Sequence, residues 1–345
     1  MVTDSFHSAI DLSNSIKDKQ ISPLEVMDDC IESIEARNPS INALVFTALD
    51  EARENAAKLE QALMAGEARG DFFGIPTAYK DFLPGVPGWP TSFGGIEAAR
   101  SLDTGWSLWA KTMVEQGAIL VGRTNAPTLA LRGVTDNMLY GPTSTPFKVG
   151  WNSGGSSGGS CSAVADGLFR IANTSDAGGS TRIPAAWCGV YGFKNSVGTV
   201  PVITRPNGWS PQFPYCIEGH ATRTVKDTAY ALQHLAGFDP RDPLSYERGE
   251  IDYIGALDGS MKGWCIGYTT DFGIYPVDPE IAEAVRNAAK RFEDAGATVE
   301  EVEFSFERGH LDYAETWCRT ASVATFSRLR SFKAQGIDLL RDHPD

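Results

Sequence analysis

The stretch "ISPLEVMDDCIESIEARN", residues 21–38, carries its apolar residues at helical spacing. Ser22 stands at the N-cap position, Pro23 follows at the first helical position, and Glu25 completes a capping box. One face of this segment carries Met27, Cys30, Ile31 and Ile34. The pattern predicts a well-delimited helix whose apolar face packs against a core.

Further along, helical periods alternate with short apolar runs that are typical of strands. Within residues 263–304, "GWCIGYTTDF" and "ATVEEVEF" read as strands, and a helix between them is capped by Asp278 and stopped by Gly296. The segment "WSLWAKTMVEQG" predicts another helix, which leads into a strand in "AILVGRTN". Strand, helix and strand in succession imply a crossover unit in an α/β sheet. We expect residues 106–125 and 263–304 to share one sheet, and residues 201–220, rich in Pro, Gly and aromatic residues, to form a long surface or pocket-covering loop.

Composition narrows the class of protein. The 345 residues are 42% hydrophobic and 21% charged, which is enough apolar material for a large core. The formal net charge of -14 repels phosphate backbones and acidic lipid surfaces, so direct contact with nucleic acid or membrane is not expected. The N-terminal residues lack the pattern of a signal peptide, and no run of about 18 uncharged apolar residues occurs, so we expect a cytoplasmic protein.

The cysteines indicate neither a disulfide framework nor a metal site. No C-x-x-C pair occurs, and no histidine stands at metal-ligand spacing from a cysteine. All six are expected to be reduced core residues: Cys30, Cys161, Cys188, Cys216, Cys265 and Cys318.

Two segments rich in Gly and Ser are the main candidates for chemistry. The first, "SGGSSGGSCSAVADG" at residues 153–167, has the composition of a linker but runs directly into apolar residues at helical spacing. The second contains "DAGGS", residues 176–180, where successive N–H groups can point into one concavity and hold a negative oxygen. A phosphate nest is one use of such a turn, but neither segment matches a phosphate-binding motif. An oxyanion hole beside a nucleophilic serine fits better.

A nucleophilic serine needs a base, and either histidine or lysine can serve. No histidine lies between residues 8 and 219, the span that holds both segments, although a Ser-His-Asp triad could be assembled across the fold. Lys80, in "GIPTAYKDFLPGVP", ends a short apolar strand between two aromatic residues. Burial at such a strand end lowers the pKa of a lysine and makes it a candidate base. The alternative is a strand-end lysine that extends to solvent.

The segments "GIPTAYKDF", "SGGSSGGS" and "SDAGGSTRIPA", in that order, resemble the signature of the amidase signature family of serine hydrolases. The similarity covers nearly the whole chain. It implies an α/β amidase signature fold, a mixed central β-sheet flanked by helices on both faces, in a single domain over residues 1–345 with a signature core at about 74–200. Family members continue well past "LLRDHPD", so the C-terminal part of the usual chain is expected to be missing. Within the family, "SDAGGS" and "TDFGIYPVDPEI" are most similar to amidases that resemble the nylon-oligomer (6-aminohexanoate cyclic dimer) hydrolase.

The resemblance also implies a mechanism. Ser180 matches the nucleophile, Ser156 the serine that follows a cis peptide bond after Gly155, and Lys80 the base. Ser156 would relay the proton of Ser180 to neutral Lys80 and later to the leaving amine. The backbone N–H groups of Ala177, Gly178, Gly179 and Ser180 match the oxyanion hole. The resemblance implies no cofactor and no metal.

Other residues receive supporting roles. Asp176 and Arg182 match family positions that brace the active-site loops, either as an ordinary buried ion pair or with a direct part in catalysis. Ser157 and Ser160 are expected to form local hydrogen bonds at the start of the following helix. Thr124 and Asn125 are expected in a structural turn at a strand end near the pocket. The apolar pocket is expected to draw on Trp187, Tyr191, Trp209, Phe213 and Tyr215, unless these aromatic residues are simply core.

The function predicted from the sequence is therefore hydrolysis of a small-molecule carboxylic amide through a Ser180 acyl-enzyme. Two alternatives stay open: the glutaminase subunit of a tRNA-dependent amidotransferase, and a non-catalytic binding protein on a shortened amidase scaffold. The substrate and the oligomeric state, for which a homodimer is one option, do not follow from the sequence.

Overall fold

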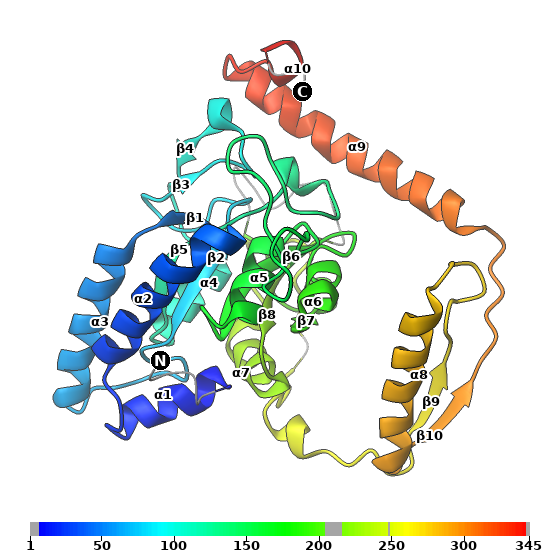
Figure 1. Cartoon of the computed structure of the whole chain (residues 1–345), viewed down its shortest axis with the longest axis horizontal. Coiled ribbons are helices and arrows are strands. Elements are labelled where there is room, and N and C mark those ends of the chain that lie inside the picture. The colour runs from blue at the N-terminus through cyan, green and yellow to red at the C-terminus, as the bar shows by residue number, and fades with distance from the viewer. Residues whose placement is uncertain (1–6, 204–215, 248, 343–345) are drawn as a thin grey trace. The chain divides into compact units, whose positions relative to one another are not determined.

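The computed structural model describes residues 7–203, 216–247 and 249–342, which divide into two units (Figure 1). The first unit takes in the described residues up to Ile254 and resumes at Ala324, and the second runs from Gly255 to Val323. The longest helix, α9 (His310–Ala334), begins in the second unit and ends in the first, which also holds α10 (Leu339–Asp342).

The first unit contains nearly all of the regular structure. Its other helices are α1 (Ala9–Lys17), α2 (Pro23–Ile41), α3 (Leu49–Met64), α4 (Leu108–Glu115), α5 (Gly158–Asp166), α6 (Arg182–Cys188) and α7 (Val225–Leu235). Its strands are β1 (Leu44–Thr47), β2 (Pro76–Lys80), β3 (Pro90–Thr91), β4 (Ser101–Leu102), β5 (Ile119–Thr124), β6 (Ile171–Asp176), β7 (Tyr191–Phe193) and β8 (Ile217–Thr222). Short 3-10 helices occupy Glu97–Ala99 and Thr128–Ala130.

Strand β5 shows how the alternation of apolar residues builds a layered core. Successive side chains of a strand point to opposite faces. Ile119 and Val121 therefore enter one apolar cluster with residues of α2, α3, α5 and α6, whereas Leu120 enters another with residues of α1, α4 and α7. The sheet layer thus has helices on both faces, and the expected α/β class is confirmed.

The sheet layer consists of two three-stranded sheets. Strand β5 pairs in parallel with β2 and antiparallel with β1, which gives the order β1-β5-β2. Strand β8 pairs antiparallel with both β6 and β7, which gives the order β6-β8-β7. Strands β2 and β6 are neighbours that are joined by side chains, since Thr77 Oγ1 donates to the carbonyl of Ile171 at 2.9 Å. Lys80 is the last residue of β2, so it lies beside this junction.

The second unit contains the predicted crossover at residues 263–304. Strands β9 (Cys265–Tyr268) and β10 (Thr298–Glu301) pair in parallel, α8 (Pro279–Asp294) connects them, and a 3-10 helix precedes them at Gly255–Asp258. The prediction that this crossover shares a sheet with residues 106–125 is wrong. Among the described residues, β9 and β10 form a two-stranded sheet that is separate from the sheet β1-β5-β2. The number of domains stays a prediction.

The local predictions from sequence are mostly confirmed. Ser22 Oγ accepts the N–H of Glu25 at 3.1 Å and the Glu25 carboxylate accepts the N–H of Ser22 at 2.7 Å, which forms the capping box of α2. The helix in residues 263–304 is capped by Asp278 as expected. The expected loop at residues 201–220 needs correction, because residues 217–220 belong to β8, where they pair with β6; residues 204–215 lie outside the described part.

The Gly/Ser segment is packed rather than flexible. All residues from Ser153 to Ser160 are buried, and α5 begins inside the segment at Gly158. A Cβ atom on Gly159 would lie 2.4 Å from the backbone N of Asn125 and 2.6 Å from the carbonyl O of Ala43. Only glycine therefore allows α5 to approach β1 and β5 this closely.

We expect Gly159→Ala to lower the free energy of unfolding by about 2 kcal/mol, because rigid backbone atoms must move to admit the methyl group. Urea-induced unfolding measures the change. Gly237→Ala is the matched control, since a Cβ there meets no atom within 4 Å. Equal free energies of unfolding for the two variants would show that the contact of α5 with β1 and β5 at Gly159 can admit a methyl group.

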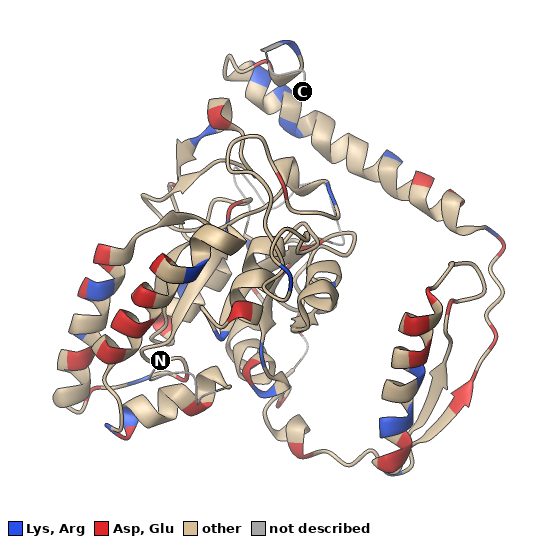
Figure 2. Cartoon of the chain, in the orientation of Figure 1, with Lys and Arg blue, Asp and Glu red and all other residues tan. Residues whose placement is uncertain are grey.

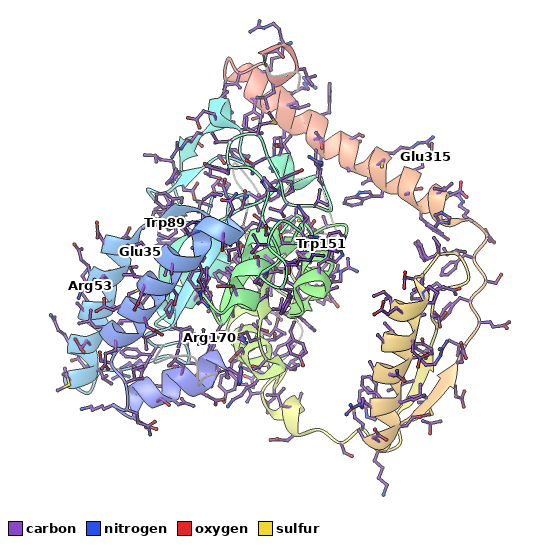
Figure 3. All side chains as sticks on the ribbon, in the orientation of Figure 1. Glu35, Arg53, Trp89, Trp151, Arg170 and Glu315 are labelled. Atoms are coloured by element: carbon purple, nitrogen blue, oxygen red, sulfur yellow. The ribbon has the colours of Figure 1, made fainter. Side chains whose placement is uncertain are left out.

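The surface and the cysteines complete the description. Acidic residues are frequent along α2, α3 and α8, in keeping with the net charge of -14 (Figure 2). Arg53 of α3 pairs with Asp28 of α2 at an exposed site (Figure 3). No described helix has both the length and the apolar character needed to cross a bilayer. All six cysteines are free, but the core prediction is wrong for Cys265 and Cys318, which are exposed on elements of the second unit.

Candidate active site

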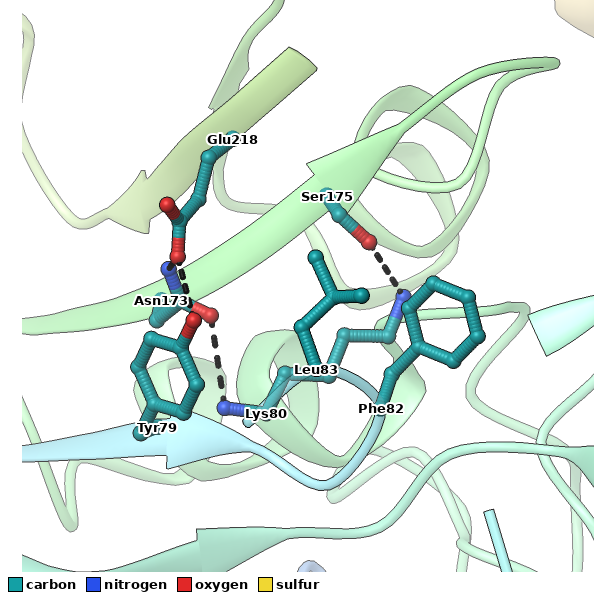
Figure 4. A pocket seen from close by; sticks show the side chains of 7 residues that line it. All are labelled: Tyr79, Lys80, Phe82, Leu83, Asn173, Ser175 and Glu218. Atoms are coloured by element: carbon teal, nitrogen blue, oxygen red, sulfur yellow. Dashed lines mark hydrogen bonds between the residues drawn. The ribbon is translucent and has the colours of Figure 1, made fainter. Parts of the chain in front are cut away.

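The structure brings Lys80 together with both Gly/Ser segments. Lys80 is buried at the end of β2, and its Nζ atom lies 2.7 Å from Ser156 Oγ and 2.9 Å from Ser157 Oγ. The same atom lies 3.0 Å from Ser175 Oγ (Figure 4). Ser156 and Ser157 immediately precede α5, and Ser175 lies on β6. The lysine therefore does not extend to solvent, and its amine is surrounded by hydroxyl groups.

The backbone at the first segment has the conformation that the resemblance implied. The peptide bond between Gly155 and Ser156 is cis. Ser156 and Ser157 are both fully buried, immediately before the first residue of α5. The two hydroxyl groups reach Lys80 from adjacent residues.

Burial lowers the pKa of Lys80 to about 7. The loss of hydration penalises the ammonium form, and the smaller opposing contributions of Cys216, Asp176 and Cys161 do not offset it. A substantial fraction of Lys80 is therefore a neutral amine near pH 7, able to accept a proton from Ser156.

Asp176 organises the second segment. Its carboxylate accepts the N–H of Gly179 at 2.8 Å and of Thr181 at 3.1 Å, and it pairs with Arg182 at 2.9 Å. Burial opposes ionisation of Asp176, but the hydrogen bonds from Arg182 and Gly179 outweigh it, so the pKa of the carboxyl group lies below its ordinary value. The predicted bracing contacts are thus present.

The turn leaves three of the four predicted oxyanion donors open. The N–H of Gly179 is donated to Asp176, so Gly179 does not fit the predicted role. Within the described chain, no hydrogen bond uses the N–H groups of Ala177, Gly178 or Ser180. These three groups remain candidates to hold a developing negative oxygen.

Ser180 lies beside the lysine cluster but is not yet joined to Ser156. Its side chain is partly exposed, its carbonyl accepts the N–H of Ser157 at 3.1 Å, and no hydrogen bond links its hydroxyl to another described residue. Hydrogen bonds of a catalytic group are often completed only when substrate binds. The structure therefore holds the Ser156–Lys80 half of the predicted relay.

Several predicted neighbours have other roles. Ser157 and Ser160 do not cap α5, because Ser157 contacts Lys80 and Ser160 Oγ donates to the carbonyl of Asn173 at 2.6 Å. Thr124 ends β5 and its hydroxyl lies 2.6 Å from that of Ser160, and Asn125 holds the following turn by bonds to Gly141 and Thr143.

The predicted aromatic pocket is not supported. Trp187 and Tyr191 are about half exposed, so the core interpretation does not describe them, and their place in a pocket stays a prediction. Trp209, Phe213 and Tyr215 lie outside the described residues. The histidine alternative gains no support either: the ring of His220 is fully buried and burial lowers its pKa to about 4, and His234 pairs with Asp71.

Sequence reasoning missed Ser175 and two further residues near Lys80. Asn173 and Ser175 are two apart on β6, so they face the same side, towards Lys80. Glu218 on β8 is buried beside Asn173. The alternating polar residues of the strand segment "IANTSD" were the sequence signal that could have pointed to Asn173 and Ser175.

Comparisons with known proteins agree with this geometry. A family model described as amidase matches residues 25–342. An acylamidase from Rhodococcus erythropolis is 39% identical over 85% of this chain and 61% of its own length. A glutamyl-tRNA(Gln) amidotransferase subunit from Chromobacterium violaceum is 34% identical over 84% of this chain and 59% of its own. The chain thus spans about three-fifths of the length of these curated relatives.

Two of the solved structures that match the chain are also amidases or amide hydrolases. A bacterial aryl acylamidase of the amidase signature family matches with a TM-score of 0.93 and 43% identity, over 98% of this chain and 69% of its own. A 6-aminohexanoate cyclic dimer hydrolase in complex with substrate matches with a TM-score of 0.77 and 28% identity, over 87% of this chain and 61% of its own. The identity is thus higher to the two acylamidases than to the hydrolase that the "SDAGGS" variant indicated.

Proposed function

Because the chain belongs to the amidase family, we propose that it hydrolyses a carboxylic amide to an acid and an amine through an acyl-enzyme on Ser180. One observation carries the proposal: the buried Lys80 amine, with a pKa of about 7, lies 2.7 Å from the hydroxyl of Ser156. A neutral lysine in contact with a serine is the arrangement that lets a serine relay protons.

In the proposed reaction, Ser180 Oγ forms a bond to the amide carbonyl carbon. Its proton passes to Ser156 Oγ as the proton of Ser156 passes to the neutral amine of Lys80. The N–H groups of Ala177, Gly178 and Ser180 hold the negative oxygen of the tetrahedral intermediate. The relay then returns the proton to the amine as the carbon–nitrogen bond breaks. Water, deprotonated by the same relay, releases the acid and restores the Ser180 hydroxyl.

We propose an N-acyl aryl amine as the substrate class. Two relatives whose names describe acylamidases are 39% and 43% identical to the chain, compared with 34% for the amidotransferase relative and 28% for the cyclic dimer hydrolase. A small amide is the only ligand that the proposed chemistry needs. The cytoplasmic location stays a prediction.

The test compares the wild-type chain with Ser180→Ala on a panel of amides: anilides, alkyl amides, the 6-aminohexanoate cyclic dimer and glutamine. We expect release of an aryl amine by the wild-type chain and a loss of at least about 10⁴-fold in Ser180→Ala, since the nucleophile is removed. Covalent labelling of Ser180 by a fluorophosphonate measures the nucleophile separately.

The outcomes distinguish the alternatives. Turnover of glutamine alone would favour the amidotransferase interpretation, for which the glutamyl-tRNA(Gln) amidotransferase relative is the supporting observation. A folded chain that neither hydrolyses an amide nor reacts with the fluorophosphonate would contradict the amidase proposal and favour a binding protein.

A further inference from the structure

The junction between β2 and β6 is held by side chains at the position of Lys80. The backbone N–H of Lys80 donates to Asn173 Oδ1 at 3.3 Å, and the Nδ2 group of Asn173 donates to Glu218 Oε1 at 3.2 Å. Three strands, β2, β6 and β8, are linked through this chain of contacts (Figure 4). This chain of contacts ends at the carboxyl group of Glu218, which has no role in the proposed reaction.

Glu218 fixes the orientation of the Asn173 amide. A side-chain amide has one acceptor and one donor group, and rotation by 180° exchanges them. Because Glu218 accepts from Nδ2, the oxygen of Asn173 must face the N–H of Lys80. A rotated amide would place its oxygen against the oxygen of Glu218 and its NH₂ group against the N–H of Lys80.

The same carboxyl oxygen also anchors the residue before the lysine. The hydroxyl of Tyr79 donates to Glu218 Oε1 at 2.6 Å. Tyr79 and Glu218 are both almost completely buried, so bulk solvent does not compete for this contact. Glu218 thus acts on β2 twice, through Tyr79 and through the Asn173 contact to Lys80.

Glu218 and Lys80 line one small cavity. Its volume is about 10 Å³, at the lower limit for holding one water molecule, and its wall includes Tyr79, Asn173 and Ser175. Burial raises the pKa of Glu218 to about 7, despite the hydrogen bonds from Tyr79 and Asn173 that favour the carboxylate. An ionised Glu218 beside this cavity would favour the ammonium form of Lys80.

The other charged or titratable groups around these two residues lie on several elements. Asp176 on β6 and Cys161 on α5 act on Lys80, Arg123 on β5 acts on Tyr79, and Cys216, before β8, acts on both Lys80 and Glu218. Burial raises the pKa of both cysteine thiols, so these thiols stay neutral near pH 7. Asp176 is therefore the carboxyl group that acts directly on the charge of the lysine amine, and Glu218 faces the same small cavity as Lys80.

We propose that Glu218 is a positioning residue for Lys80: by holding Asn173 and Tyr79 it places the lysine at the serine cluster, and its charge controls how readily the amine loses its proton. The role in turnover rests on the proposed function. The effect on the lysine itself does not.

The first measurement follows the titration of Lys80 in the full chain by NMR of ¹³Cε-labelled lysine, with the Lys80 signal assigned by its loss in Lys80→Met. Glu218→Gln keeps an oxygen that can accept from Tyr79 and Asn173 but removes the ionisable group. We expect the Lys80 midpoint to move to lower pH by about one unit, because a carboxylate no longer favours the ammonium form. An unchanged midpoint would overturn the proposal.

The second measurement separates kcat from KM on an amide that the wild-type chain hydrolyses. Glu218→Leu removes the acceptor, and we expect kcat to fall about 10²-fold with little change in KM, because the base and not the substrate is displaced. Glu218→Gln should retain the wild-type value of kcat, measured above the pH at which Lys80 is deprotonated, within a few-fold. If Glu218→Leu does not fold, Glu218→Gln decides through the lysine titration.

Asp227 provides the matched control. It is a buried carboxyl group on α7 that accepts from Ser8 Oγ at 2.7 Å and from the N–H of Ile10 at 3.1 Å, in contacts that do not involve Lys80. Asp227→Asn should leave the titration midpoint of Lys80 and kcat unchanged. A shift of the Lys80 midpoint in Asp227→Asn as large as that in Glu218→Gln would overturn a specific role for Glu218. If the wild-type chain hydrolyses no amide, the proposed function fails, and the lysine titration still decides the role of Glu218.

Discussion

Replacement of Lys80 by Arg is expected to abolish amide turnover, with a loss of about 10³-fold or more in kcat/KM. Arginine keeps the positive charge but has no accessible neutral form, so Ser156 loses its proton acceptor. Lys80→Met is the companion variant, because it is neutral, unbranched and suited to a buried site. Lys80→Met should retain the fold, and both variants should lose activity.

The pH dependence of the wild-type chain tests the same assignment. Because burial lowers the pKa of Lys80 to about 7, activity should be low below pH 7, rise with pH through that value and reach a plateau above it. Measurement of kcat/KM from pH 5 to 9 gives the midpoint. Near wild-type turnover by Lys80→Arg, with the same pH profile, would rule out lysine as the base and return attention to His220.

The largest expected effect on stability comes from the buried ion pair of Asp103 and Arg123. Both side chains are almost completely inaccessible and they are in direct contact. Asp103→Ala leaves the guanidinium buried without its counter-charge and also removes the acceptor for the N–H groups of Gly85 and Val86. We expect the free energy of unfolding to fall by about 3–5 kcal/mol, as measured by urea denaturation.

The control for this variant is an exposed ion pair. Asp28→Ala removes the partner of Arg53, where both side chains are at least half exposed, and its effect should lie within the error of the measurement. If Asp28→Ala and Asp103→Ala lowered the free energy of unfolding by similar amounts, burial would not explain the contribution of the Asp103–Arg123 pair to stability.

The sequence was most informative where chemistry is local. The capping box of Ser22 and Glu25 is a contact between residues three apart, so the motif alone predicts it. The position of Lys80 at a strand end and the cis bond after Gly155 were likewise predictable, the first from an apolar run and the second from the family resemblance.

The partners of Lys80 were harder to predict because they come from distant elements. Ser175 and Glu218 are 95 and 138 positions away along the chain, and only the pairing of β6 with β8 and the proximity of β2 bring them to the lysine. The N–H of Gly179 was misassigned for a related reason. A turn sequence shows which N–H groups converge, but not that the carboxylate of Asp176 already accepts one of them.

Lys80 is held by both of its peptide groups. Its N–H donates to Asn173, and its carbonyl accepts from Arg123, whose guanidinium also reaches the carbonyl of Leu83. A residue fixed in this way opens to solvent only when the surrounding sheet opens, which makes it part of the slowest-moving region of a protein. Any conformational change that accompanies substrate entry or product release must therefore take place in other segments, while the base itself moves only by rotation about its four side-chain bonds.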